Sequence, residues 1–367
     1  MIRDFHIQRF RGLRDFRMHD LGRVNLLVGT NNCGKSSMLE GLEILSSQGN
    51  LRTILNATYR RGERIWVEDD TRRYMEGDIS HLFYGHKFEV GSNISIQSES
   101  AEGKSGIEID VVPREFDKPN LFPESESLGL SEQLDLRVAW RNGGPEKVVP
   151  FPLSQRGGIS SRQMSRLSSD TTDTPPVQFV STSALAIEEV MALFDEVVLT
   201  PEEDLLVEAL QTIEPEIERI AAIGGDRPRA SSFGRQGRIV VKLKGFSERI
   251  PIGSMGDGIW RMLGIAIALV NAENGVLLVD EIDTGLHYSV LSDMWRLVQK
   301  TADRLNVQVF ATSHSRDCYE SLAAISRDNV SEESQVTIQR IDNNSDTSVA
   351  FTEQEIVAAS QRGIEVR

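Results

Sequence analysis

The sequence predicts an α/β fold in which a mixed sheet surrounds one helix, joined by an antiparallel β lobe and a small helical lobe. Three observations carry this prediction. Val24, Leu26, Leu27 and Val28 predict a short buried strand, and a glycine-bounded turn joins it to a helical pattern of apolar residues. Period-two runs between residues 93 and 149 predict antiparallel strands. Residues 184–223 change to helical spacing, which predicts the third part.

The composition is that of a globular chain. Its 367 residues are 39% hydrophobic and 26% charged, which suffices for a sizeable core. The longest apolar run, residues 262–270, is far shorter than the roughly 20 residues that a membrane-spanning helix needs. Two cysteines are too few for a disulfide framework. We therefore expect a cytoplasmic chain with no membrane partner. The net charge of −15 disfavours general affinity for nucleic acids but leaves a local basic groove open.

The first strands are expected within residues 1–28, where apolar residues alternate with arginines. Phe5, Ile7 and Phe10 are followed by Phe16 and Met18 at strand spacing. This pattern predicts two strands of a half-buried sheet. The short buried strand at residues 24–28 comes next.

The turn after that strand fits the phosphate-loop pattern G-x-x-x-x-G-K-[ST]. Gly29 and Gly34 allow backbone N–H groups to face an anion, and the N-terminus of the following helix adds partial positive charge. Lys35 then reaches the β- and γ-phosphates, and Ser36 ligates Mg²⁺. The turn therefore predicts a P-loop NTPase. The residues assigned to nucleotide binding here are Gly29, Asn31, Asn32, Cys33, Gly34, Lys35, Ser36 and Ser37.

The middle of the chain supplies the two lobes. Residues 93–149 predict an antiparallel meander. Within residues 184–223 two short helices are expected, and both Ile213 and Ile217 fit the apolar face of the second. Residues 238–252 alternate as a hairpin and lead to a second glycine-rich loop. In that loop Ser254 and Gly256 precede an almost wholly apolar helix, so a hydroxyl and bare N–H groups can grip a second phosphate.

The last part of the chain carries polar residues at strand ends. Residues 276–279 form a buried strand that ends in Asp280 and Glu281. An aspartate there can hold hydrated Mg²⁺, and the adjacent glutamate can orient or deprotonate an attacking water. A further buried strand leads to His314, which can touch a γ-phosphate or that water. A hairpin and a helix are expected to close the chain.

The order of these motifs is that of an ABC-type ATPase head. The chain resembles the compact SMC-like ATPases related to the RecF and OLD proteins, which are AAA-family ATPases of prokaryotes. The segments that carry the resemblance are FHIQRFRGLRDF, GTNNCGKSSMLEGL as Walker A, SMGDGIWRMLGIAIAL as the ABC signature, LLVDEIDTGLHYS as Walker B with the D-loop, FATSHSRDC as the His switch, and GIEVR.

The resemblance implies roles for the residues at these positions. It implies that Lys35 and Ser36 bind phosphate and Mg²⁺ of MgATP and that Asp280 supports the metal. Glu281 and His314 are then the catalytic residues, the histidine sensing the γ-phosphate. No glutamine is assigned to the Q-loop position of this family.

The resemblance also implies a single ATPase head with shared ATP sites. Its expected parts are residues 1–183 with Walker A and the meander, 184–268 with the helical lobe and signature loop, and 269–367 with Walker B, the D-loop, the His switch and the closing hairpin and helix. Ser254 and Gly256 would contact the ATP of another copy. ATP would thereby join a homodimer or a higher homo-oligomer head to tail.

The function implied is a switch or scaffold for a separately encoded effector, a nuclease or a toxin, in anti-phage defence. The chain leaves no room for the TOPRIM nuclease domain of OLD proteins, which is why the effector is expected elsewhere. DNA is a further candidate partner, because RecF-like heads act in DNA repair at DNA ends.

Two other classes stay open. One is the ATP-binding subunit of a membrane transporter, which the arginine-rich N-terminal strands disfavour. The other is a dimer that binds ATP without hydrolysing it, which Glu281 disfavours.

Overall fold

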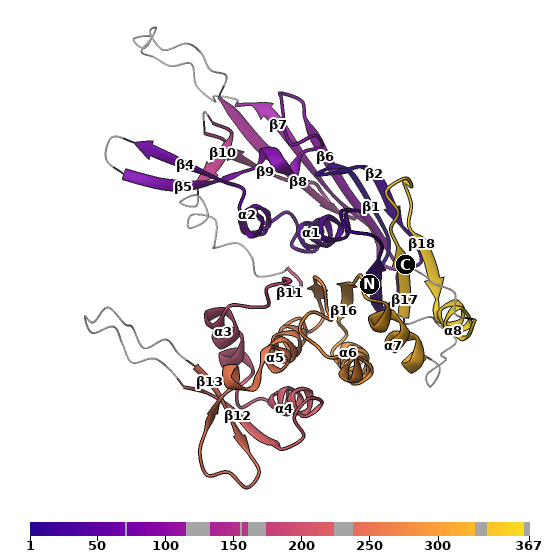
Figure 1. The fold of residues 1–367 in the computed structure, drawn as a ribbon. Helices are drawn as coiled ribbons and strands as arrows, with labels where there is room; N and C mark the ends of the chain where they lie inside the picture. The colour runs from indigo at the N-terminus through magenta and orange to yellow at the C-terminus, as the bar shows by residue number, and fades with distance from the viewer. Residues whose placement is uncertain are drawn as a thin grey trace. The chain divides into compact units, whose positions relative to one another are not determined.

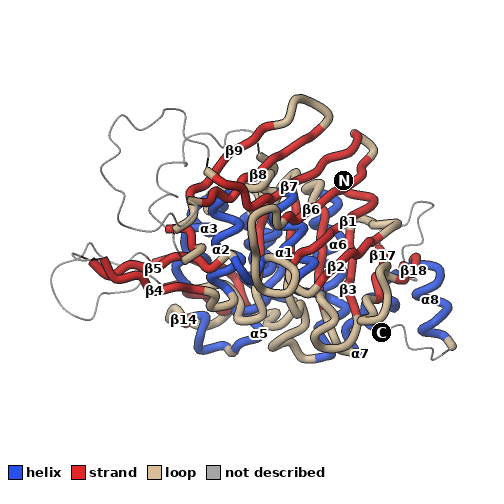
Figure 2. The backbone as a smooth tube through the Cα atoms, turned by 90° about the horizontal axis from the view of Figure 1, so that it is seen from above, coloured by secondary structure: helices blue, strands red, loops and turns tan. Residues whose placement is uncertain are grey.

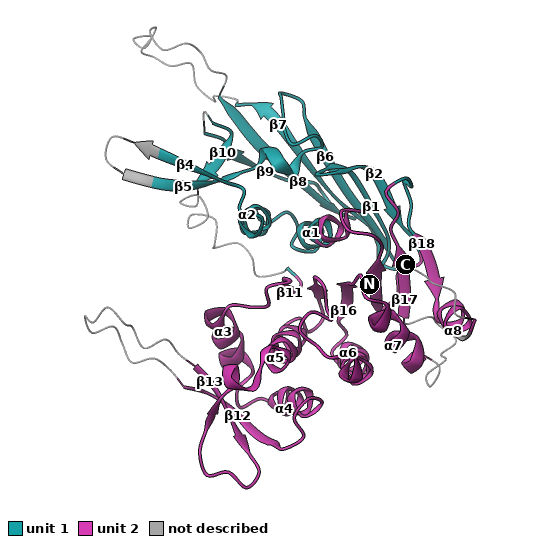
Figure 3. Ribbon diagram, in the orientation of Figure 1, with its two compact units in different colours: residues 1–19, 40–174, 344–348 teal, residues 20–39, 175–343, 349–367 magenta. Residues whose placement is uncertain are grey.

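The computed structural model describes residues 1–69, 72–114, 133–154, 156–160, 174–223, 238–326 and 336–362. The GIEVR segment at residues 363–367 lies outside them. The chain forms two compact units, coloured separately in Figure 3. Unit 1 comprises Met1–His19, Glu40–Thr174 and Asn344–Ser348, and unit 2 comprises Asp20–Leu39, Pro175–Asn343 and Val349–Arg367. The predicted α/β fold with mixed sheets is confirmed.

Unit 1 is built on a six-stranded antiparallel sheet in the order β2-β1-β6-β7-β8-β9. Its strands are β1 (Ile2–Phe10), β2 (Leu13–Met18), β6 (Asn93–Ser100), β7 (Gly103–Pro113), β8 (Leu134–Asn142) and β9 (Lys147–Pro152). Figure 2 shows them side by side from β9 to β2. The two N-terminal strands and the meander that the sequence predicts are both present. Their apolar side chains alternate because successive residues of a strand point to opposite faces.

A helix pair and a second, three-stranded sheet complete unit 1. The sheet has the order β10-β5-β4, with β4 (Arg64–Asp69), β5 (Arg72–Asp78) and β10 (Gly158–Ser160), and η1 (Ser80–Leu82) follows β5. Helix α2 (Leu51–Arg60) follows α1 (Lys35–Ser46), whose residues from Glu40 onward belong to this unit. A Cβ added at Gly41 would lie 2.5 Å from the Ile7 side chain, so glycine allows α1 to pack closely on β1.

Unit 2 is built on a mostly parallel sheet in the order β11-β15-β16-β3-β17-β18. Its strands are β11 (Val177–Val180), β15 (Val276–Val279), β16 (Gln308–Thr312), β3 (Val24–Val28), β17 (Val336–Arg340) and the antiparallel edge strand β18 (Val349–Thr352). Strands β11, β15, β16, β3 and β17 are parallel neighbours. Their carboxyl ends therefore lie at one edge of the sheet, where ligands bind in folds of this kind.

Helices and a small sheet form the rest of unit 2. They are α3 (Ile187–Val197), α4 (Glu203–Gln211), η3 (Ile252–Met255), α5 (Asp257–Val270), η4 (Tyr288–Val290), α6 (Leu291–Arg304), α7 (Arg316–Ser326) and α8 (Glu353–Gln361). The small sheet has the order β12-β13-β14, with β12 (Ile217–Ile223), β13 (Arg238–Leu243) and β14 (Ile250–Pro251). Figure 1 shows α5, α6 and α7 on one face of the parallel sheet.

One sequence prediction in this region is wrong. The spacing predicts a helix that includes Ile213 and Ile217, but α4 ends at Gln211 and Ile217 begins strand β12. Pro215 lies between them, and a proline disfavours the helical conformation of the residue before it. The hairpin expected at residues 238–252 is confirmed, with β12 as a third strand.

Helix α5 is the centre of the apolar core of unit 2. Its side chains from Ile259 to Val270 are buried, apart from the partly exposed Trp260. A helix that is apolar on all sides must be surrounded by other elements. In unit 2, α3, α4, α6 and strands β11 and β15 contact it. Within the described ranges, no helix combines the length and apolar character needed to cross a lipid bilayer.

A buried charge cluster ties the β1–β2 turn of unit 1 to its helices. The Arg11 side chain is 3% exposed, and its Nε and Nη1 lie 2.5 Å and 2.7 Å from carboxylate oxygens of Glu40 and Glu63. The carboxylate of Glu40, on α1, also pairs with Arg61, whose Nε lies 2.7 Å from it. Buried charges of this kind need partners because they have lost their hydration.

Arg11→Met should therefore destabilise the fold. It leaves the buried Glu40 with one cation fewer, and breaking a buried ion pair costs about 3 kcal/mol or more. Urea unfolding followed by circular dichroism measures the change. The control is Arg141→Met, because Arg141 pairs with Glu146 but its side chain is 67% exposed. An exposed pair is worth less than about 1 kcal/mol. Equal losses for both variants would contradict the argument.

Candidate active site

The phosphate loop connects β3 to α1 in unit 2 through backbone angles that few residues tolerate. Gly29 has a φ of 148°, Asn32 of 62° and Gly34 of 97°. A Cβ added at Gly29 would lie 2.3 Å from the backbone oxygen of Ile341, which leaves no room for a side chain. Gly34 then accepts the first helical hydrogen bond of α1 from Met38 at 2.9 Å. The loop therefore has the curled backbone that the sequence predicts, at the N-terminus of a helix.

The side chains of this loop divide by exposure. Asn31 and Asn32 are exposed, whereas Cys33 and Ser37 are buried. The ammonium group of Lys35 lies inside the loop and donates to the carbonyl oxygens of Gly29 and Thr30, both at 2.8 Å. This position puts a positive charge at the centre of the loop, where an anion would be held.

The Asp280 carboxylate, directly after β15, gathers hydroxyl groups from three other segments. Ser36 Oγ, at the start of α1, lies 2.9 Å from Oδ2 and 3.1 Å from Oδ1. Thr312 Oγ1, at the end of β16, donates to Oδ1 at 2.7 Å. Thr182 Oγ1, after β11, lies 3.4 Å from Oδ2. The result is a compact group of oxygen atoms beside the phosphate loop.

These oxygen donors fit a small divalent cation. Mg²⁺ prefers oxygen ligands at 2.0–2.1 Å in octahedral geometry, so two neighbouring ligands lie about 2.9 Å apart. Ser36 Oγ and Asp280 Oδ2 are 2.9 Å apart. The pair can thus hold Mg²⁺ without moving far.

The Glu281 backbone adopts a strained conformation. Its φ is 48°, in the left-handed region that costs a residue with a side chain about 1–2 kcal/mol. Its N–H donates to Thr312 Oγ1 at 2.8 Å. Its carboxylate accepts a hydrogen bond from Thr284 Oγ1 at 3.2 Å and lies 3.5 Å from Nδ1 of His314. The acid and the histidine that the sequence singles out are therefore neighbours at the sheet edge.

Ser254 and Gly256 belong to a separate segment, the loop before α5. Ser254 is exposed in η3, and Gly256, with a φ of 98°, precedes α5. In the part of the chain that the structure describes, neither is hydrogen-bonded to residues 29–37. An exposed serine loop at a helix N-terminus remains open to an anion from outside the chain.

Sequence reasoning missed three residues of the site: Thr182, Thr312 and Arg261. The threonines supply hydroxyls to Asp280, and Arg261 of α5 donates to the backbone oxygens of both Asp280 and Glu281 at 2.7 Å and 2.9 Å. A lone threonine after a strand has no distinctive pattern. Arg261 did offer a sequence signal, because it is a charged residue within an otherwise apolar helix.

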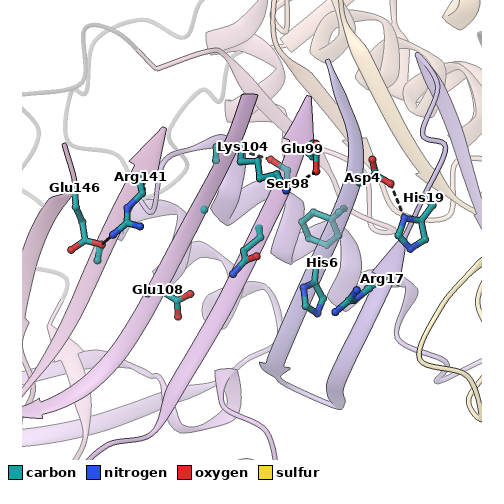
Figure 4. A pocket seen from close by; sticks show the side chains of 15 residues that line it. Asp4, His6, Arg17, His19, Ser98, Glu99, Lys104, Glu108, Arg141 and Glu146 are labelled. Carbon is teal, nitrogen blue, oxygen red and sulfur yellow. Dashed lines mark hydrogen bonds and ion pairs between the residues drawn. The ribbon is translucent and has the colours of Figure 1, made fainter. Parts of the chain in front are cut away.

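A hollow of about 650 Å³ lies elsewhere, on the large sheet of unit 1 (Figure 4). Three of its basic side chains are paired with carboxylates. His19 lies 2.7 Å from Asp4, Lys104 lies 3.1 Å from Glu99, and Arg141 lies 3.0 Å from Glu146. Those three bases are thus partly neutralised, whereas a nucleic-acid backbone prefers uncompensated positive charge.

Comparisons with known proteins agree with this geometry. The sequence matches the family described as AAA ATPase domain over residues 1–117 and 202–318. Over 353 residues it is 23% identical to a protein of Helicobacter pylori named ATP/GTP phosphatase, with 89% of each chain covered.

Two solved structures share the fold. One is an SMC head bound to the C-winged helix domain of ScpA, with 13% identity, a TM-score of 0.53, and 96% of this chain and 97% of that chain covered. The other is an Smc head domain with an extended coiled coil, bound to the C-terminal domain of ScpA and derived from Pyrococcus furiosus. It has 10% identity, a TM-score of 0.53 and 98% of both chains covered. The predicted P-loop NTPase head is thereby confirmed as the fold.

Thr312→Val should destabilise unit 2 by about 1–3 kcal/mol, because the fully buried Thr312 hydroxyl serves both Asp280 and the Glu281 N–H. Thr312→Ser keeps that hydroxyl and should be milder. A matched control is Thr301→Val on α6. Thr301 is also buried, and among the described residues its Oγ1 has no hydrogen-bond partner, so its loss should be nearly neutral. Urea unfolding compares the variants. A Thr312→Val protein as stable as Thr301→Val would refute this reading.

Proposed function

The chain belongs to the AAA ATPase domain family, and from that premise we propose that it is a nucleotide-operated switch in which ATP joins two copies and hydrolysis releases them. It is an ATPase with the fold of an SMC head. The observation that carries the proposal is the 2.9 Å contact between Ser36 Oγ and Asp280 Oδ2. That contact joins the phosphate loop to the end of β15, so one site has both phosphate-binding and acidic groups.

In this proposal the phosphate loop holds the substrate. The β- and γ-phosphates of ATP lie in the loop at residues 29–36, where backbone N–H groups and the N-terminus of α1 stabilise negative charge. The Lys35 ammonium donates to the backbone oxygens of Gly29 and Thr30 at 2.8 Å in this structure. When ATP binds, it donates to phosphate oxygens instead. Charge-assisted hydrogen bonds of this kind are the strong ones.

Ser36 and Asp280 are the residues that would hold Mg²⁺. When bound, this ion neutralises charge on the β- and γ-phosphate oxygens. Thr312 and Thr182 keep the Asp280 carboxylate in place through their hydroxyls, at 2.7 Å and 3.4 Å.

Glu281 is the residue proposed to activate water. The water oxygen bonds to the γ-phosphorus, its proton passes to the Glu281 carboxylate, and the bond from the γ-phosphorus to the bridging oxygen breaks. ADP leaves with the electron pair of that bond, and inorganic phosphate is released. The Nδ1 atom of His314 lies 3.5 Å from the Glu281 carboxylate, so in this proposal the ring contacts the γ-phosphate. Positioning and charge stabilisation do most of the work in this chemistry.

The switch follows if the second anion site belongs to another copy. Ser254 and Gly256 are exposed and lie at the start of α5, so they can bind the ATP held by a second chain. ATP would then favour the dimer because two chains contact it, and hydrolysis would remove that preference. The SMC heads of known structure share the fold of this chain.

In this proposal a partner protein responds to the change between the ATP-bound dimer and the released chains. Both SMC heads compared above are bound to domains of ScpA, which supports a protein partner for this chain. Our finer proposal is a separately encoded effector, a nuclease or a toxin, in anti-phage defence. The paired charges in the hollow of unit 1 favour a protein over DNA. Co-purification with an effector supports this choice, whereas tight, salt-sensitive binding to DNA ends would favour a RecF-like role.

Two substitutions separate binding from chemistry. Lys35→Ala should weaken ATP binding about tenfold or more, because a charged hydrogen bond is lost. Glu281→Gln should bind ATP as the parent does and lower kcat about 10²–10⁴-fold, because only the proton acceptor is removed. Fluorescent-nucleotide titration and phosphate release measure the two quantities. Parental turnover by Glu281→Gln would remove this carboxylate from the mechanism.

Ser254→Arg tests the shared site. The bulky cation should prevent the second copy from approaching the phosphates, so turnover falls while ATP binding at the phosphate loop is retained. In a Glu281→Gln background with MgATP, light scattering should show a doubled mass that Ser254→Arg abolishes. Ser247→Arg, in the exposed turn between β13 and β14, is the matched control. An unchanged mass distribution and full turnover in Ser254→Arg would exclude Ser254 from the contact.

A further inference from the structure

Arg261 is a buried arginine in the otherwise apolar part of α5. It is 3% exposed. Burial lowers the pKa of its guanidinium, although the nearby charges of Asp280, Asp283 and Glu281 oppose that shift. Arginine stays charged even so. A buried cation needs a structural or functional reason, because an apolar side chain would suit this core better.

The guanidinium joins the ends of two parallel strands. Its Nη1 donates to the Ser181 backbone oxygen, after β11, at 2.5 Å. Its Nη2 donates to the backbone oxygens of Asp280 and Glu281, after β15, at 2.7 Å and 2.9 Å. The planar fork of arginine suits such a multiple contact, which the single ammonium of lysine cannot reproduce.

One end of this bridge controls the Glu281 backbone. Glu281 is held in its left-handed conformation from both sides, by Thr312 Oγ1 at its N–H and by Arg261 at its carbonyl. A strained conformation persists only where the surroundings determine it. Losing one of these two contacts would let the backbone relax, and the carboxylate beside Thr284 and His314 would turn away.

The other end controls the segment after β11. Ser181, whose carbonyl Arg261 holds, directly precedes Thr182, whose hydroxyl lies 3.4 Å from Asp280 Oδ2. Arg261 thus fixes the backbone on both sides of the Asp280 carboxylate. It does so from α5, the helix that begins after Gly256.

We propose that Arg261 is a positioning residue for ATP hydrolysis: it holds the Glu281 backbone and the Thr182 segment in their working geometry and links both to α5. The proposal rests on the proposed function, in which Glu281 accepts the proton of water and Gly256 faces the ATP of a second copy. A shift of α5 on dimerisation would reach Glu281 through this one side chain.

Arg261→Lys and Arg261→Gln test the proposal in the full-length chain. We expect kcat to fall about tenfold to a hundredfold, since small misplacements of catalytic groups have effects of that size. KM and the Kd for ATP should stay within about twofold of the parent, because the phosphate loop is untouched. Lysine should recover little of the lost turnover. The control is Arg296→Lys on α6, an exposed arginine paired with Asp293, which should leave kcat unchanged.

A double-mutant comparison separates positioning from general damage. If Arg261 acts through Glu281, then Arg261→Lys should cause no further fall in the residual turnover of Glu281→Gln. Three results would overturn the proposal. They are a kcat in the double variant that falls by the product of the two single losses, a loss of ATP affinity in Arg261→Lys as large as its loss of kcat, and a parental kcat in Arg261→Lys. So would thermal melting of both Arg261 variants below the assay temperature, which would make the role structural. Failure of the proposed function is seen separately, as parental turnover by Glu281→Gln alone.

Discussion

The candidate site depends on the convergence of three chain segments on the Asp280 carboxylate. Asp280 follows a fully buried strand, and its neighbours in the sheet are parallel, so their carboxyl ends meet at one edge. Ser36, Thr312 and Thr182 each bring a hydroxyl to it from a different segment. The curled phosphate loop at Gly29 and the left-handed Glu281 both lie beside this carboxylate, and Thr312 hydrogen-bonds both Asp280 and the Glu281 N–H.

Local patterns predict the parts of the site that lie within one segment. The strand, glycine turn and helix around Lys35 form a continuous motif, as does the apolar strand before Asp280 and Glu281, so both appear where the sequence places them. Local patterns do not predict the roles of Thr182, Thr312 and Arg261. These roles arise from the strand order, which brings together residues far apart in the chain. The prediction of a helix through Ile217 is wrong, because it follows the spacing of the apolar residues and neglects Pro215, which disfavours a helix at the preceding residue. The proposed contact of Ser254 with a second copy stays a prediction, since it concerns another chain.

Two buried arginines hold loops in conformations that burial alone would not select. Arg11 ties the turn of β1 and β2 to carboxylates of unit 1, and Arg261 ties two strand ends of unit 2 through backbone oxygens. A buried charge adds little net stability but penalises every arrangement that leaves it unpaired. Each arginine therefore favours the arrangement in which its partners are in place. In unit 2 the geometry specified includes Glu281, which is why the structural and chemical consequences of Arg261 have to be measured separately.

In the proposed function, the sheet edge around Asp280 binds the phosphates of ATP for hydrolysis. A crystal structure of the Glu281→Gln chain with ATP and Mg²⁺ would show whether it does. We expect the γ-phosphate within hydrogen-bond distance of Lys35 Nζ and the cation between Ser36 Oγ and the Asp280 carboxylate, with the substituted side chain at position 281 facing the γ-phosphorus. Phosphates bound away from residues 29–36, or a cation with neither Ser36 nor Asp280 among its ligands, would contradict it.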